Sequence, residues 1–251
     1  MKHIKLFEQF INEGVHDPGI LKAFFMAGGP GSGKSYIASE IFSLPQADKM
    51  QTVSYATGLK LVNNDDSFER NMKKAGYDIG KISKYAQDED VWADIMVLRD
   101  KAKNTTRNRQ NNYIGGRLGQ IIDGTGKNYN RIKGHRNLYK DFGYDTYMIF
   151  VNTPLEVALD RNQMRDRKLP PDIVTKMWEE VQQNLGKFQK LFGSNNMIIV
   201  DNSSYDNGDI LRNIEKEIRK KIKQPVKNHL GKRWIKEMSA PYAKDKNRPA
   251  K

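Results

Sequence analysis

The sequence predicts an α/β fold in which a parallel sheet of about five strands is sandwiched between helices. Short apolar runs alternate with longer segments of helical periodicity along most of the chain, and a glycine-rich turn joins the first run to the first helical segment. Strands that alternate with helices form parallel sheets with both faces covered. With 251 residues, the chain has room for one such domain and for appendages at its ends.

Five short runs have the length and composition of strands. The first, from Leu21 to Ala27, ends at the glycine-rich turn, and the second, from Leu59 to Asn63, is followed directly by polar side chains. Ligand sites in open α/β sheets lie at such carboxyl ends. The predicted strands cover 21–27, 59–63, 118–122, 144–151 and 196–200.

Helices are predicted where apolar residues recur every three or four positions. In 88–109, Val91, Ile95, Leu98 and Ala102 fall on one face, and another helix is expected to begin near Asn130. The remaining predicted helices cover 36–42, 154–167, 172–192 and 209–221. We therefore expect a core domain at 20–205, preceded by an amphipathic leader at 1–14 and followed by a C-terminal helix and basic tail at 206–251.

Residues 28–35 read Gly-Gly-Pro-Gly-Ser-Gly-Lys-Ser, a complete phosphate-binding loop between a strand and a helix. Glycines let successive backbone N–H groups curl around a triphosphate. Lys34 is expected to reach the β- and γ-phosphates, and the Ser35 hydroxyl to bind Mg²⁺. The motif predicts a P-loop NTPase fold with ATP and Mg²⁺ as cofactors. The expected nucleotide-binding residues are Gly28, Gly29, Gly31, Ser32, Gly33, Lys34 and Ser35.

Two classes of P-loop protein are disfavoured by the sequence. Motor-type ATPases usually carry a strand ending in Asp-Glu, where the glutamate polarises a water, but here Asp123 is followed by Gly124. GTP-specific enzymes usually carry an Asn-Lys-x-Asp clamp, and the chain has none. Transfer of the γ-phosphoryl group to a bound hydroxyl remains, and it requires positioning, charge neutralisation and a base.

The base is expected at the end of the second strand, in Asn64-Asp65-Asp66-Ser67-Phe68. A carboxylate there faces the γ-phosphate and can accept the proton of an acceptor hydroxyl. The segment resembles the zeta-toxin-like and polynucleotide 5′-kinase-like kinases, in which an Asp is followed by a small or polar residue and an aromatic. The resemblance implies Asp66 as the base. Asp65 is the rival and a candidate substrate contact, and either acid could instead cap the next helix.

The resemblance extends to Asp160-Arg161-Asn162-Gln163-Met164-Arg165, which is followed by Lys168-Leu169-Pro170. In the resembling family, an Arg-Asn and a second Arg form a lid over the nucleotide. Arg161 and Arg165 are four apart and therefore share one face of a helix, where two guanidiniums can grip phosphate oxygens. The alternative is a solvated basic helix end in which these arginines pair with Asp160 and Asp166.

A third matching stretch is Ile121-Ile122-Asp123-Gly124-Thr125. In the resembling family, an Asp and Thr cluster after an apolar strand supports the metal and contacts the acceptor. The resemblance thus implies a metal role for Asp123 and a substrate role for Thr125, whereas Asp123 could also cap the helix near Asn130.

The acceptor itself is left open by the sequence. Residues 69–117, which include Arg107, Arg109 and Arg117, match no acceptor-binding motif. A zeta-toxin-like kinase acting on a small hydroxyl compound such as a nucleotide sugar, and a polynucleotide or modified-base DNA kinase, both stay open.

The charge is concentrated at the C-terminus. Of the net charge of +13, residues 212–251 carry +10, because they hold fourteen Lys and Arg against four Asp and Glu. From Ser239 onward the segment is polar and contains proline, which predicts an irregular basic tail. Such a tail contacts nucleic acid, other phosphate polymers or acidic surfaces without reading sequence, and the alternative is a charged terminus that only adds solubility. There is no cysteine, signal peptide or membrane-spanning run, so a cytoplasmic location and no membrane contact are expected.

The leader at 1–14 stands apart from the core. Its apolar residues form one stripe at helical spacing, and Ile11-Asn12-Glu13 followed by Gly14 resembles the processing site of capsid-targeting leaders of T-even-like phages. That resemblance implies a phage-encoded protein, present in the host cytoplasm or packaged in the virion, and a third hypothesis of a virion nucleic-acid-binding protein. The alternative is an amphipathic helix packed on the core.

Overall fold

The computed structural model describes residues 15–17, 19–44, 53–54, 57–165, 168–204 and 208–245. In this part of the chain the five strands form one wholly parallel sheet with the order β2-β3-β1-β4-β5. The strands are β1 (Lys22–Ala27), β2 (Lys60–Val62), β3 (Gln120–Ile122), β4 (Asp145–Asn152) and β5 (Met197–Asp201). Each predicted strand coincides with an observed one, and the predicted α/β fold is confirmed.

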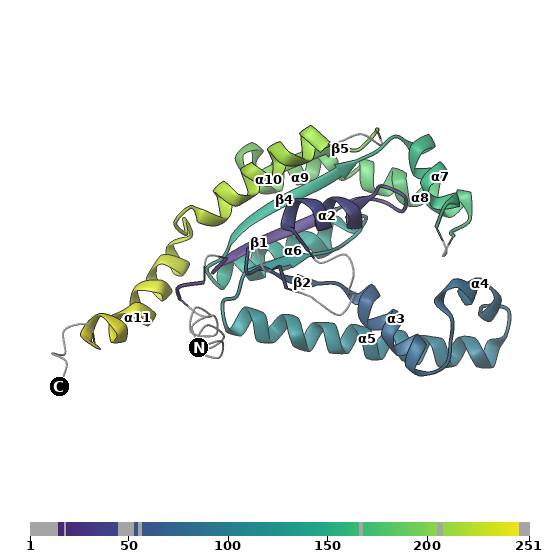
Figure 1. The fold of residues 1–251 in the computed structure, drawn as a ribbon, viewed down its shortest axis with the longest axis horizontal. Helices are drawn as coiled ribbons and strands as arrows, with labels where there is room; N and C mark the ends of the chain where they lie inside the picture. The colour runs from purple at the N-terminus through teal and green to yellow at the C-terminus, as the bar shows by residue number, and fades with distance from the viewer. Residues whose placement is uncertain are drawn as a thin grey trace, which may run out of the picture.

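Helices cover both faces of the sheet and one of its edges (Figure 1). On one face lie α2 (Lys34–Phe42) and α10 (Gly208–Lys223), and on the other α6 (Tyr129–Asp141), α8 (Pro171–Gln182) and α9 (Leu185–Phe192). The remaining helical elements are α3 (Asn64–Lys74), η1 (Ile79–Lys81), α4 (Ile82–Tyr85), α5 (Glu89–Gly115), α7 (Leu155–Gln163), η2 (Ser194–Asn196) and α11 (His229–Asp245). No helix in the described ranges is both long and apolar enough to cross a membrane.

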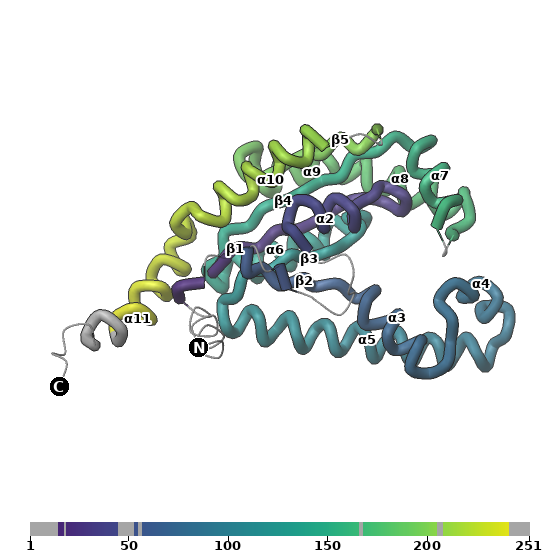
Figure 2. Tube along the Cα trace, in the orientation of Figure 1, coloured from purple at the N-terminus to yellow at the C-terminus, as the bar shows by residue number. Residues whose placement is uncertain are grey.

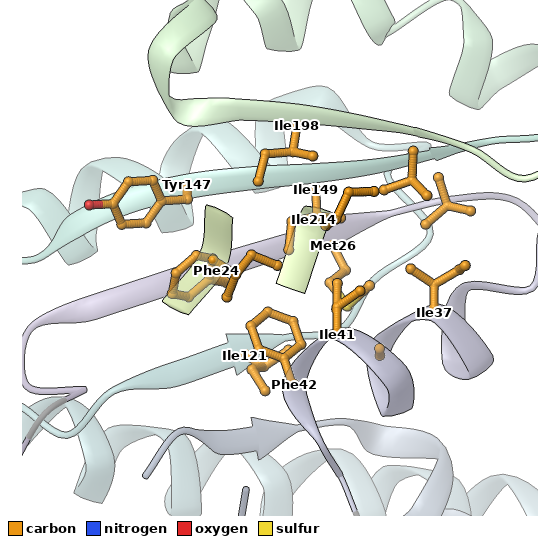
Figure 3. Close-up of a cluster of buried hydrophobic side chains, with 14 of the residues drawn as sticks. Phe24, Met26, Ile37, Ile41, Phe42, Ile121, Tyr147, Ile149, Ile198 and Ile214 are labelled. Carbon is orange, nitrogen blue, oxygen red and sulfur yellow. The ribbon is translucent and has the colours of Figure 1, made fainter. Parts of the chain in front are cut away.

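The core is divided by the sheet because side chains alternate along each strand. Phe24 and Met26 of β1 enter the cluster with α2 and α10, whereas Phe25 enters the cluster with α6 and α9. Figure 3 shows the first cluster, in which the rings of Phe24 and Tyr147 stack with their centroids 4.8 Å apart. Because β1 is buried on both faces, it lies at the centre of the sheet. The glycine-rich turn that follows it therefore lies at the carboxyl end of the central strand.

An arm made of α3, α4 and α5 extends from the β2 edge of the sheet. The tube in Figure 2 shows α5 running along this edge and beyond it. The arm has its own small core of Phe68, Met72, Ile95 and Ala102. The α5 helix begins where predicted, because the Asp88 side chain accepts a hydrogen bond from the Val91 N–H at 3.1 Å. It continues six residues past the predicted end at 109, to Gly115.

Two predicted helices end earlier than the sequence suggested. The α7 helix stops at Gln163, so Arg165 lies beyond it and does not share a helical face with Arg161. The helix predicted at 172–192 is broken between α8 and α9 at Asn184, whose buried side chain donates to the carbonyls of Gly126 at 3.0 Å and Lys127 at 2.8 Å. At the break between α8 and α9, these side-chain hydrogen bonds hold the chain where one continuous helix was predicted.

A helix in the basic C-terminal segment extends past Ser239, from which the composition predicted irregular chain. The α11 helix covers His229–Asp245, and Trp234 and Ile235 pack against the cluster on the α6 face. The guanidinium of Arg117 lies 5.8 Å from the Trp234 ring, which ties α11 to the end of α5. Packing thus orders a segment that is too polar to fold alone. The leader at 1–14 and the last residues, 246–251, lie outside the described residues.

Candidate nucleotide-binding site

The phosphate-binding loop connects β1 to α2 and depends on two left-handed glycines. Gly31 and Gly33 have φ of +74° and +76°, a region that residues with a Cβ rarely adopt. A Cβ at Gly31 would also overlap the carbonyl of Ala158 in α7. The N–H groups of Gly31 and Gly33 donate to no group in the described part of the chain. They are therefore available to a bound anion at the start of a helix.

The carbonyl of Ser32 fixes the loop to the ends of two further strands. It accepts hydrogen bonds from Asn202 Nδ2 at 2.7 Å and from Thr153 Oγ1 at 3.1 Å. The Trp178 indole donates to the Thr153 carbonyl at 2.7 Å, so α8 supports the same point. Sequence reasoning missed Asn202, Thr153 and Trp178. The available signal was that Thr153 and Asn202 are polar residues directly after β4 and β5.

Ser32 and Gly29, both predicted to bind nucleotide, have different surroundings. The Ser32 hydroxyl is buried and has no hydrogen-bond partner among the described residues, and a Cβ at Gly28 would lie 2.7 Å from it. Gly29 is half-buried, and a Cβ there would lie 3.7 Å from the Trp178 Cα. The Ser32 N–H donates to the Gly29 carbonyl at 3.2 Å, so both backbone groups of Ser32 hold the loop together, and the predicted nucleotide contact of Ser32 stays a prediction.

Lys34 and Asp123 form an ion pair at the carboxyl end of the sheet. The other carboxylate oxygen of Asp123 accepts a hydrogen bond from Asn63 Nδ2 at 3.0 Å. Asp123 therefore does not cap α6. That role belongs to Asn128, whose side chain accepts from the Arg131 N–H at 2.9 Å. The structure thus places the lysine of the loop against the acid that sequence reasoning assigned to metal binding.

Asp65 and Asp66 lie in the first turn of α3, next to this pair. The helix is capped by Asn63, whose Oδ1 accepts from the Asp65 N–H at 2.8 Å, so neither aspartate is the cap. Asp65 is exposed, whereas Asp66 is half-buried and already takes part in an interaction. Because Asn63 also donates to Asp123, the helical turn that carries both acids begins at a residue in contact with the Lys34 ion pair.

The two arginines predicted to form a lid have different environments. Arg161 donates from Nη1 to the Asn202 carbonyl at 2.9 Å and from Nη2 to the Ser204 carbonyl at 3.2 Å. A Cβ at Gly33 would lie 3.6 Å from Arg161 Nη1, which places this guanidinium beside the loop. Arg165 is exposed, and its N–H donates to the Asn162 carbonyl at 3.3 Å. The structure brings Arg161 to the loop and leaves Arg165 at the rim.

Asn162, between the two arginines, is completely buried. Its Nδ2 donates to the Leu169 carbonyl at 2.8 Å, and its Oδ1 accepts from the Leu169 N–H at 3.2 Å. The side chain therefore joins the two ends of the segment that carries Arg165. Sequence reasoning gave Asn162 no role of its own.

The segment after Asp123 passes beneath the phosphate-binding loop. The Thr125 carbonyl accepts from the Gly28 N–H at 3.0 Å, and the Thr125 residue is half-buried. Gly126 has φ of +84°, and a Cβ there would lie 2.6 Å from the Cβ of Ala27. Thr125 thus supports the loop through its backbone, while its proposed substrate contact would use the side chain.

The donors near the loop suit a magnesium ion that is shared with a nucleotide. Ser35 is exposed in the first turn of α2, and Asp123 supplies a carboxylate at the same end of the sheet. Mg²⁺ prefers oxygen ligands and usually binds through one or two protein groups plus substrate phosphates. No cluster of three or more His, Asp or Glu in the described residues would hold a metal alone. The residues present therefore fit a nucleotide-bound Mg²⁺.

Solved structures provide the comparison that bears on this arrangement. A chain from the PezAT chromosomal toxin-antitoxin system of Streptococcus pneumoniae matches with a TM-score of 0.52 and 14% identity, covering 88% of this chain and 94% of the other. The similarity is one of fold, a five-stranded parallel sheet flanked by helices. A chain of the AvrRxo1-ORF1:AvrRxo1-ORF2 complex with sulphate ions matches with a TM-score of 0.50 and 14% identity, covering 85% and 71%. No family model and no curated protein matches the sequence.

Proposed function

We propose that the protein is an ATP- and Mg²⁺-dependent phosphotransferase that moves the γ-phosphoryl group of ATP to a hydroxyl acceptor. The observation that carries this proposal is the convergence of Lys34, Asp123 and Asn63 with the acidic first turn of α3, beside a loop with free N–H groups. The loop supplies the donor half of a transfer site, and the acids of α3 supply a proton acceptor. The zeta-toxin-like pattern of the sequence and the similarity of the fold to the solved structures above support this proposal.

On the donor side, the backbone N–H groups of Gly31 and Gly33 bind phosphate oxygens, and Lys34 neutralises the γ-phosphoryl group. Lys34 is paired with Asp123 before the nucleotide arrives, so its side chain is held beside the loop. Ser35 and Asp123 would hold Mg²⁺, directly or through water, and the ion would supply further neutralisation of the phosphate charge. These contacts lower the barrier by stabilising charge that builds up during transfer.

On the acceptor side, Asp66 is the base that removes the hydroxyl proton. The acceptor oxygen then forms a bond to the γ-phosphorus, the bond from that phosphorus to the bridging oxygen breaks, and ADP leaves. Asp65 remains the rival, because it occupies the same helical turn and is the more exposed of the two. Exchanging each for asparagine separates them, since only the base is needed for proton transfer.

The lid of the site is built from α7 and the segment that follows it. Arg161 lies beside Gly33, where it can contact the phosphates once its hydrogen bonds to the β5 loop are exchanged. Arg165 lies on the exposed segment anchored by Asn162 and closes over the nucleotide. Closure brings two guanidiniums to the transferring group and excludes water, which limits hydrolysis of ATP.

Transfer of label from γ-labelled ATP tests the proposal. Nucleotide sugars, single-stranded oligonucleotides and duplexes serve as acceptors. We expect Lys34→Ala to lower the rate by at least about 100-fold, roughly 3 kcal/mol of lost transition-state stabilisation. Lys133→Ala is the matched control, because Lys133 is an exposed lysine on α6. The proposal fails if the wild-type protein transfers label to none of these acceptors and consumes ATP no faster than Lys34→Ala.

A further inference from the structure

A hollow of about 550 Å³ lies at the amino-terminal ends of the strands, opposite the phosphate-binding loop. It exists because the edge strand β5 is shorter than its neighbour β4. β4 begins at Asp145, but β5 pairs with it only from Met148 onward. The first residues of β4 therefore have no strand beside them on that side. The end of α6 and the connection between α10 and α11 form the other walls.

The walls of this hollow carry an excess of positive charge. Arg136 and Lys140 of α6, Lys227 and His229 line it, together with the acids Asp141 and Asp145. Asp145 is already neutralised, because its carboxylate binds the Lys22 ammonium at 2.9 Å and the N–H groups of Lys227 and Asn228, each at 2.9 Å. Asp141 is exposed at the end of α6. Three permanent cations thus face one uncompensated carboxylate.

None of these cations forms an ion pair in the described part of the chain, and Arg136 donates from Nη1 to Asn137 Oδ1 at 3.2 Å and lies 5.8 Å from the centre of the Phe192 ring. Lys140 and Lys227 have exposed side chains without an ion pair or hydrogen bond there. Arg136 is half-buried, and its Nε is buried with no partner. Burial lowers the pKa of Arg136, because the charged guanidinium is partly removed from water. A partly desolvated cation of this kind is stabilised by an anionic ligand.

The backbone around the hollow also favours an anion. The α11 helix starts here, its first turn contains no acid, and Asn228 accepts from the Leu230 N–H at 3.0 Å. The C-terminal end of α6 also faces the hollow, and the carbonyls of a helix C-terminus repel an anion. One of them is covered, because the Lys140 carbonyl accepts a hydrogen bond from Asn228 Nδ2 at 2.8 Å. The positive end of one helix therefore faces the hollow, while the negative end of the other is partly covered.

We propose that this hollow is a phosphate-binding site, separate from the nucleotide site and independent of the proposed transfer reaction. Arg136, Lys140 and Lys227 hold the phosphate oxygens, and the positive end of α11 adds a favourable field. The phosphate belongs either to a free metabolite or to a nucleic-acid backbone, which present the same charged oxygens. Because the strands are parallel, a ligand here lies at their amino-terminal ends, whereas Lys34 lies at their carboxyl ends. It therefore does not compete with ATP.

The ring signals of His229 in a two-dimensional NMR spectrum report on this hollow alone, because the phosphate-binding loop lies at the opposite ends of the strands. Assignment uses His229→Gln. The probes are inorganic phosphate, AMP and a 12-nucleotide single strand. We expect saturable shifts of the His229 signals, with a midpoint raised at least about tenfold in the Lys140→Gln, Lys227→Gln double variant. The control is Lys133→Gln with Lys190→Gln, two exposed lysines on α6 and α9 outside the hollow.

Two results would overturn the site. One is the absence of any His229 shift at roughly 20 mM of every probe, which excludes even millimolar affinity. The other is equal weakening by the control pair, because that indicates diffuse surface charge. The probes also separate the two sources. Binding of the oligonucleotide below the concentration needed for AMP, with a steep dependence on salt, assigns the phosphate to nucleic acid, whereas saturation by AMP or phosphate at similar concentrations assigns it to a metabolite.

Discussion

Replacing Gly31 by alanine should separate the phosphate-binding loop from α7. Gly31 has φ of +74°, and the left-handed conformation costs a residue with a Cβ about 1–2 kcal/mol. The added Cβ would also overlap the Ala158 carbonyl oxygen and lie 2.8 Å from the carbonyl carbon and 3.0 Å from the Cα. These are backbone atoms that cannot rotate away, so overpacking adds about 1–3 kcal/mol.

The expected loss of unfolding free energy for Gly31→Ala is thus about 2–5 kcal/mol, or roughly 5–15 °C in melting temperature for a chain of this size. Gly76→Ala is the matched control. Gly76 has φ of +84°, but no atom lies within 4 Å of its Cβ position. It should lose only the conformational part, about 1–2 kcal/mol. Urea denaturation gives both values, and nucleotide titration should show weaker ATP binding for Gly31→Ala alone.

Equal unfolding free energies for the two variants, within about 0.5 kcal/mol, would refute this reasoning. The result would mean that the contact between the loop and α7 is not close enough to exclude a methyl group. If Gly31→Ala is destabilised but keeps its affinity for ATP, the predicted loss of ATP binding is refuted. The N–H groups of Gly31 and Gly33 would then not depend on the contact between the loop and Ala158.

Two further predictions concern the lid and the charge of α6. Asn162→Ala removes both hydrogen bonds to Leu169 from a buried site, so it should lower the free energy of unfolding by about 1–3 kcal/mol. It should also lower the rate of phosphoryl transfer more than Asn137→Ala, a control at an exposed position. Unchanged stability and an unchanged transfer rate would contradict the anchoring role of Asn162. Burial and Arg131 lower the pKa of His135 below its ordinary value of 6.5, so the unfolded chain binds the proton more readily and stability falls as the pH drops below that value. Urea denaturation at pH 7.5 and at pH 5.5 should show that the free energy of unfolding falls less for His135→Gln than for the wild-type protein. An identical fall in both proteins would contradict this prediction.

The elements that the sequence predicted well are those whose signal is local. β1 is an uninterrupted apolar run and is buried along its whole length, and the loop after it is a contiguous motif. The break between α8 and α9 was missed because its cause is distant. Asn184 binds the carbonyls of Gly126 and Lys127, which lie 57 or more residues away in the chain.

The candidate site divides in the same way. Lys34, Asp65, Asp66 and Asp123 were chosen from motifs, and the structure gathers them at one end of the sheet. Asn63 was missed as a functional residue. Its side chain caps α3 with one atom and binds Asp123 with the other, a bridge that exists only when β2 and β3 are neighbours.

The sequence by itself determined the alternation of strands and helices and the identity of the phosphate-binding loop, because backbone conformation and apolar periodicity are properties of neighbouring residues. The tertiary structure alone decided which side chains meet. It paired Lys34 with Asp123, fixed Ser32 through Asn202 and Thr153, ordered α11 by packing Trp234, and left the hollow beside β4. Each of these depends on the order and lengths of strands that are far apart in the chain, and no local pattern encodes that order.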